Sequence, residues 1–235
     1  MYVHSAHSKS GAACGHSRDK GFAQALNFNI DIPPVFAVQT LKLEIAAAAA
    51  ALIVEEGLEY GLAKRRAVKQ LALAGRAELP DNDQIEEAVR EYIALFCGDT
   101  QPAELTALRE LALVWMVRMT EFRPYLTGAV WHGTATRLSD IYIQLFCDDP
   151  KSAEIALIEH NVDYEPSTIT GFTGTAVEAL SLSSLCVPLA ETVGVHYVVY
   201  DHNDLRGALR PDSKGRKPRG DLAAVQKLLL TESGV

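Results

Sequence analysis

The sequence predicts an α+β protein in which an all-α helical module precedes a mixed β-sheet with flanking helices. Two observations predict this class. Apolar residues recur at helical spacing through residues 35–121. After Phe122-Arg123-Pro124 the pattern changes to the two-residue alternation that is typical of strands. We therefore expect three parts: a flexible N-terminal arm over 1–34, a helical module over 35–121 and an α+β domain over 122–235.

Composition limits the class of protein further. The chain has 235 residues, of which 48% are hydrophobic and 22% are charged, and this is the composition of a folded protein rather than a disordered one. Its longest apolar run, residues 45–54, is half of the roughly 20 residues that span a bilayer as a helix. With no secretory signal pattern in the sequence, we expect a cytoplasmic protein with no membrane partner.

The charge balance bears on partners. A net charge of −8 opposes non-specific binding of nucleic acid, because that affinity comes mainly from neutralised phosphates. The basic segment 206–219 is expected to be an exposed loop. That this loop contacts RNA is the weakest of the functional hypotheses. In the arm, His4, His7, Cys14 and His16 match no known metal-site spacing, so a solvated tail is the favoured interpretation. The four cysteines are far apart and indicate reduced thiols.

Four helices are expected in the module. The first contains the alanines of 46–51 and ends at Gly57. A second covers 59–74 and a third covers 83–96, with Asp83 as its cap. The fourth covers 103–120.

Strands and helices alternate in the second half. We expect a short buried strand over 125–131 and a cleanly alternating strand over 141–147, followed by a helix over 151–159. Further strands are expected over 162–165, 176–182 and 193–201, and a last amphipathic helix over 221–230. In the strand 141–147, Tyr142 and Phe146 fall on the face opposite Ile141 and Ile143.

One segment carries a chemical motif. Gly128 lies in the short strand expected over 125–131; Gly133 and Ala135 come five and seven residues later, and Ser139-Asp140 opens the next strand eleven residues after Gly128. This spacing resembles the signature of the minimal nucleotidyltransferases, in the DNA polymerase beta-like superfamily. The resemblance covers roughly residues 122–205 and does not extend to the helical module.

The resemblance implies a nucleotidyltransferase-like fold that, if active, transfers NMP from an NTP to a hydroxyl acceptor with Mg²⁺. Asp140 would be the principal catalytic carboxylate and metal ligand. The family's third carboxylate lies on the strand after the next helix, where this chain offers Asp163, with Glu165 two residues further on. The implied nucleotide-binding residues are Gly128, Ala129, Gly133, Thr134, Ser139 and Tyr142.

Two departures weaken the catalytic interpretation. Ala129 stands where the family has a phosphate-contacting Ser, and Tyr142 stands where it has the second metal carboxylate. A phenol, with a pKa of about 10, is a poor ligand for Mg²⁺. The alternative is therefore a catalytically inactive nucleotide-binding protein, or a scaffold for a protein partner or a second copy. If the chain has no such site, Asp140 is a turn acid that starts a strand, Asp163 is a solvated residue at a strand end, and Gly128 and Gly133 are turn glycines.

Overall fold

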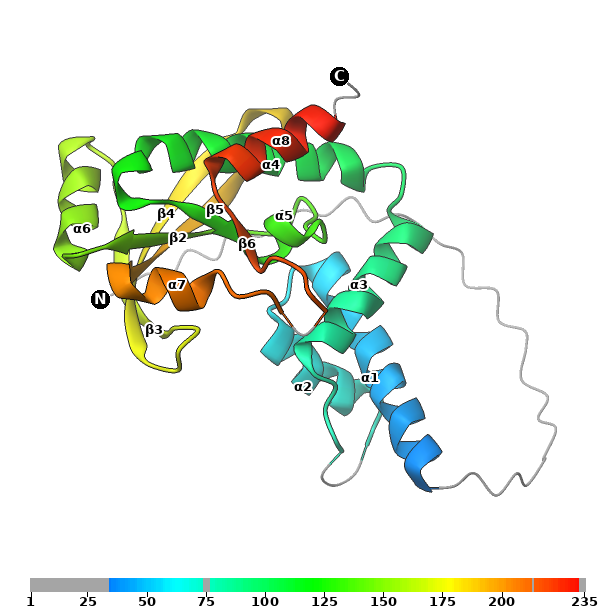
Figure 1. The fold of residues 1–235 in the computed structure, drawn as a ribbon. Helices are drawn as coiled ribbons and strands as arrows, with labels where there is room; N and C mark the ends of the chain where they lie inside the picture. Colours follow the sequence, from blue (N-terminus) through cyan, green and yellow to red (C-terminus); the bar gives the residue numbers. More distant parts are fainter. Residues whose placement is uncertain (1–33, 74–76, 213, 233–235) are drawn as a thin grey trace, which may run out of the picture. The chain divides into compact units, whose positions relative to one another are not determined.

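The computed structural model describes residues 34–73, 77–212 and 214–232. The predicted arm, apart from Pro34, lies outside the described residues, as do His4, His7, Cys14 and His16. In the described residues, six strands form one mixed sheet, and helices occupy the chain before it, so the α+β class is confirmed (Figure 1). No described helix is both long enough and apolar enough to cross a membrane.

The first three helices share a hydrophobic core of their own. They are α1 (Pro34–Glu56), α2 (Tyr60–Gln70) and α3 (Asn82–Phe96), and their buried side chains include Ile45, Ala49, Ile85 and Val89. Small alanines at the buried positions of α1 let the neighbouring helices approach closely. Gly57, with φ of 68°, follows α1 as predicted.

The cap of α3 differs from the prediction. Asp81, rather than Asp83, accepts the backbone N–H of Gln84 at 2.8 Å, while the Gln84 side chain accepts the N–H of Asp81 at 3.0 Å. This reciprocal pair is a capping box, and it satisfies two donors that a helix start leaves free. The helix therefore begins slightly earlier than its apolar stripe indicated.

The fourth helix, α4 (Gln101–Arg118), belongs to the core of the sheet. Leu108, Ala112 and Met116 are buried in one cluster with Leu126, Ile143 and other sheet residues. The hydrophobic core of the helical module therefore consists of α1 to α3 alone among the described residues. Sequence periodicity placed 103–120 in the module because periodicity reports that a face is apolar, not what that face packs against.

The sheet has the strand order β3-β4-β5-β2-β1-β6. Its members are β1 (Tyr125–Thr127), β2 (Ile141–Cys147), β3 (Glu165–Thr170), β4 (Ala176–Cys186), β5 (Glu191–Asp201) and β6 (Arg219–Gly220). In the described sheet β2 and β5 run parallel, while the other neighbouring pairs are antiparallel. The strand predicted over 125–131 ends at Thr127, because Gly128, with φ of 70°, turns the chain into α5 (Gly128–His132). The strand predicted over 162–165 begins only at Glu165.

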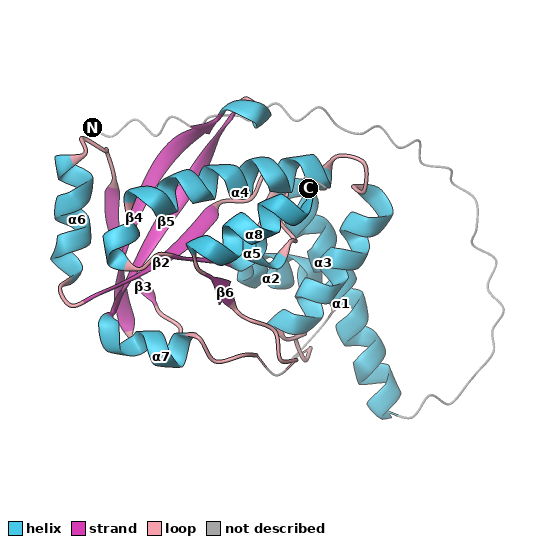
Figure 2. Ribbon diagram, turned by 45° about the horizontal axis from the view of Figure 1, so that its top comes forward, coloured by secondary structure: helices cyan, strands magenta, loops and turns pink. Residues whose placement is uncertain are grey.

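Helices cover the two faces of the sheet unequally. On the face that carries Ile141, Ile143 and Leu145 lie α4, α5, α6 (Pro150–Glu159) and α8 (Leu222–Glu232). Figure 2 shows α4 and α8 side by side over the strands. The opposite face holds Phe146, Val198 and Tyr200 beneath the short α7 (Leu205–Ala208). Three 3₁₀ turns, η1 (Thr120–Phe122), η2 (Val187–Leu189) and η3 (His202–Asp204), complete the described fold.

Candidate functional site

The less covered face of the sheet carries a row of polar side chains. In register across the sheet, Thr127 of β1 pairs with Tyr142 of β2, Tyr142 with His196 of β5, and His196 with Ser181 of β4. Because paired residues point to the same side, these side chains lie next to one another. Asp140 immediately precedes β2 and belongs to the same side.

Tyr142 connects this face to the helical module. Its ring stacks on the His196 ring, with centroids 4.7 Å apart and planes 24° from parallel. Its hydroxyl donates to Glu59 Oε1 at 2.9 Å, and Glu59 immediately precedes α2, where its side chain makes no capping hydrogen bond. Burial, followed by the charge of Glu59, raises the pKa of Tyr142 well above its usual range. The position of the implied second metal carboxylate is thus held by a neutral phenol that contacts α2.

This raised pKa predicts a pH dependence of stability. At pH values below 10.0, the ordinary pKa of tyrosine, Tyr142 is protonated in both the folded and the unfolded chain. Above 10.0 the unfolded chain loses this proton first, so the free energy of unfolding falls as the pH rises. Urea titrations from neutral to alkaline pH are expected to show a shallower fall for Tyr142→Phe than for the natural chain. Equal slopes would contradict the assignment.

Asp140 is held against the backbone of β5. One carboxylate oxygen, Oδ1, accepts the N–H of Gly194 at 3.1 Å, and the other, Oδ2, lies 3.4 Å from His196 Nε2. A Cβ atom at Gly194 would lie 2.8 Å from Asp140 Cγ, a distance that real structures do not show. The missing side chain at position 194 therefore permits the contact between Asp140 and His196.

In the turn between β1 and β2, several of the predicted nucleotide-binding residues serve the structure of the turn itself. Gly128 opens α5 and Gly133 closes it with φ of 83°. The Ser139 hydroxyl accepts the N–H of Thr136 at 3.0 Å, and Ala129 packs partly against the core. Thr134 is buried beside Tyr60. Burial raises the pKa of Tyr60 above its ordinary value. Loop capping thus accounts for Ser139, one of the predicted nucleotide contacts.

Two side chains of α4 hold this turn in place, and the motif gave no sign of them. Gln101 Nε2 donates to the carbonyls of Gly133 at 3.2 Å and Ala135 at 2.8 Å. Arg109, which is 4% exposed, donates from Nε to the carbonyl of Val130 at 3.0 Å. The sequence carries no clear signal for them, because α4 also contains Glu104, Glu110 and Arg118, and only burial in the fold distinguishes Gln101 and Arg109 from these residues.

Asp163 and Glu165 are not brought to Asp140. Glu165 begins the edge strand β3 and pairs with Ser181, while β4 and β5 lie between β3 and β2. At about 4.8 Å per strand, the backbones of β3 and β2 are roughly 14 Å apart. The strand parallel to β2 is β5, after the hairpin of β3 and β4, and it presents Gly194 and His196 beside Asp140 and Tyr142. The third carboxylate sought on the next strand is therefore absent from this neighbourhood in the described residues.

The donor set does not suit two Mg²⁺ ions. The resemblance implies carboxylates at positions 140 and 142 and a third on a neighbouring strand, since Mg²⁺ prefers carboxylate oxygens. Here the corresponding side chains are Asp140, Tyr142 and His196, and the Asp140 oxygens face Gly194 and His196. Within 34–73, 77–212 and 214–232, no group of three His, Cys, Asp or Glu side chains is arranged to hold a metal ion.

Two of the six basic side chains in segment 206–219 are engaged within the molecule, whereas Arg206, Arg210, Lys214 and Lys217 are exposed. Arg216 bonds to Glu86 at 3.0 Å and to Asp212 at 2.7 Å, and it lies 3.4 Å from Asp83. Arg219 is buried, bonds to the Gln144 side chain and stacks on Phe172, with its Cζ 4.8 Å from the ring centroid. The predicted loop is thus α7 followed by a segment in which Arg216 is bound to α3 and Arg219 to the sheet, while the other basic side chains are exposed, as expected.

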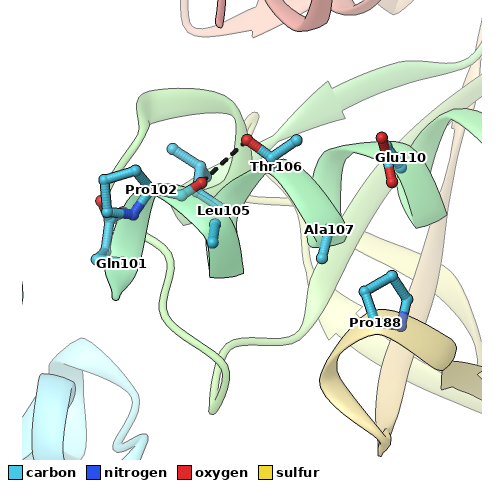
Figure 3. Close-up of a pocket in the computed structure, with 8 residues that line it drawn as sticks. Gln101, Pro102, Leu105, Thr106, Ala107, Glu110 and Pro188 are labelled. Carbon is cyan, nitrogen blue, oxygen red and sulfur yellow. Dashed lines mark hydrogen bonds between the residues drawn. The ribbon is translucent and has the colours of Figure 1, made fainter. Parts of the chain in front are cut away.

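Two cavities of about 550 Å³ each occur in the described structure. One lies between the first half of α4 and Pro188 of η2 (Figure 3), and the other lies between Arg123 and the segment 202–209. Neither contains a residue of the predicted site. Comparison with family models, curated proteins and solved structures gives no match to this chain.

Proposed function

We propose that the chain is a nucleotidyltransferase-like binding protein without two-metal catalysis. The observation that carries the proposal is the environment of Tyr142, which occupies the implied second-carboxylate position and donates to Glu59. The polar face of the sheet would then bind the helical module through the contact between Tyr142 and Glu59, and the protein would act as a scaffold. The family assignment within this proposal rests on the spacing from Gly128 to Asp140.

A second candidate is nucleotide binding without transfer. Gly128, with positive φ, opens a helix beside Tyr142, whose ring edge would lie 3.8 Å from a Cβ at position 128. Aromatic rings such as Tyr142 and His196 stack on bases, and base stacking does not need a metal. The same assay separates the two candidates.

The test measures thermal stability with each NTP, with and without Mg²⁺, for the natural chain and for Asp140→Asn. A ligand that binds the folded state stabilises it by about 2.7 kcal/mol at a hundredfold excess over Kd. For a scaffold, no NTP shifts the melting temperature, and for non-catalytic binding the shift is independent of Mg²⁺. A Mg²⁺-dependent shift that Asp140→Asn abolishes, together with pyrophosphate release, would instead establish a working transferase.

Restoring the missing carboxylate tests the family assignment directly. Tyr142→Asp places acids at 140 and 142, on the same side of β2, so Mg²⁺ is expected to raise the melting temperature of this variant more than that of the natural chain. Tyr142→Asn is the matched control, since asparagine has the same size as aspartate and carries no charge. Identical Mg²⁺ responses of the two variants would mean that position 142 is not the second metal position.

A further inference from the structure

Three side chains on the polar face form a continuous hydrogen-bonded series. Ser181 Oγ lies 2.9 Å from His196 Nδ1, and His196 Nε2 lies 3.4 Å from Asp140 Oδ2. They come from β4, β5 and the residue before β2, which are neighbours in the sheet. A nucleophile bonded to a base, with the base oriented by a third group, is the arrangement that activates a serine.

The hydrogen positions follow from the chemistry of the partners. An ionised carboxylate only accepts hydrogen bonds, so the Nε2 atom that faces Asp140 carries the ring hydrogen. Nδ1 then has its lone pair directed at the Ser181 hydroxyl, which donates to it. Asp140 is fixed in turn by the N–H of Gly194, and Tyr142 fixes the plane of the His196 ring by stacking.

The glycine at position 194 makes room for this hydrogen-bonded series. Glycine within a strand costs about 0.5–1 kcal/mol relative to alanine, and φ at Gly194 is not positive, so the backbone does not require it. Its role is to leave room for Asp140, since a Cβ there would also approach His196 Nε2 to 3.1 Å. The side chains remain accessible to solvent, with exposed fractions of 23% for His196 and 48% for Asp140.

We propose that Ser181 is a nucleophile toward activated acyl donors, with His196 as its base and Asp140 as a positioning residue. Ser181 Oγ attacks the acyl carbon and its proton passes to His196 Nδ1. As the new ester bond to Ser181 forms, the bond to the leaving group breaks, and the leaving group takes the proton from His196. Water then hydrolyses the acyl-serine.

The environment also sets the class of donor. Ser181 lies in an inner strand, where the backbone N–H groups are used in the ladders with β3 and β5. Such groups are not free to stabilise an oxyanion, so unactivated esters and amides react too slowly. Donors with good leaving groups, such as aryl esters and acyl phosphates, are the expected class.

The full chain is treated with p-nitrophenyl acetate, and acetylated peptides are identified by mass spectrometry. We expect one acetyl group on Ser181, formed at least about tenfold more slowly in His196→Gln and in Asp140→Asn, in line with the size of general-base effects. Ser183→Ala is the matched control, because Ser183 is exposed, lies on the same strand and face, and pairs with Gly194. It should leave the rate at Ser181 unchanged.

Three results would overturn the proposal: no acetylation of Ser181 in the natural chain, equal labelling of Ser183, or an unchanged rate at Ser181 in His196→Gln. Melting temperatures accompany each variant. A purely structural role for the series lowers the melting temperature of the variants without labelling Ser181, so the labelling of the natural chain decides between the two roles even where a variant folds poorly.

Discussion

Glu86→Gln is expected to lower the free energy of unfolding by about 2 kcal/mol. Glu86 is a buried carboxylate of α3 whose oxygens contact Arg90, Arg216 at 3.0 Å and His132 Nδ1 at 3.2 Å. Removing one partner of a buried ion pair costs about 3–5 kcal/mol, and the arginines here are about one-third exposed, which screens part of the loss. The variant keeps the size of the side chain and removes its charge.

Urea unfolding measures this change, and Glu87→Gln is the matched control. Glu87 neighbours Glu86 and lies 3.9 Å from Arg90 and 4.0 Å from Lys214, but its side chain is 55% exposed. Exposed pairs contribute about 0–1 kcal/mol. Glu86→Gln should also weaken the hold of α3 on Arg216, which keeps its contact with Asp83, and speed tryptic cleavage after Arg216. Equal effects of the two substitutions would show that burial at Glu86 has no energetic role.

Gly220→Ala is expected to destabilise the fold by about 2–3 kcal/mol, the upper part of the range for overpacking. A Cβ at this β6 position would lie 2.1–2.7 Å from three ring atoms of Trp131. The ring cannot move aside freely, because Trp131 Nε1 donates to the carbonyl of Lys217 at 2.8 Å. Either the tryptophan leaves its place or β6 separates from β1.

Thermal unfolding of Gly220→Ala is compared with that of Gly207→Ala. Gly207 lies in α7, its φ is not positive, and a Cβ there would meet nothing within 4 Å. Alanine favours helix over glycine by about 1 kcal/mol, so this control is expected to be neutral or slightly stabilising. Similar melting temperatures for the two variants would contradict the close packing of Trp131 on β6.

Local signals predicted the elements that local physics determines. Gly57 ends α1, and the alternation from Ile141 to Cys147 places Ile141, Ile143 and Leu145 on one buried face of β2, as expected, although Phe146 on the opposite face is buried as well. The strand over 125–131 was wrong beyond Thr127, because the apolar Val130 and Trp131 suit a short buried helix as well as a strand. Periodicity cannot separate the two over so few residues.

The site was predictable on one strand only. Asp140 and Tyr142 follow from the motif, whereas His196 and Ser181 reach them through pairing between strands that are distant in sequence. The hairpin of β3 and β4 displaced the expected partner strand, so Asp163 and Glu165 were sought one connection too early. Strand order depends on long-range packing, and no signal within residues 160–201 specifies it.

The order of the sheet has a consequence for synthesis. β1 lies between β2 and β6, and both β6 and α8 follow every other described element in the chain. On the ribosome, β1 therefore has one open edge until residues 219–232 emerge, and the side of α4 that packs on α8 stays uncovered for the same period. A nascent chain should therefore need chaperones to protect these surfaces until residues 219–232 emerge, because β6 pairs with the open edge of β1 and α8 packs on α4.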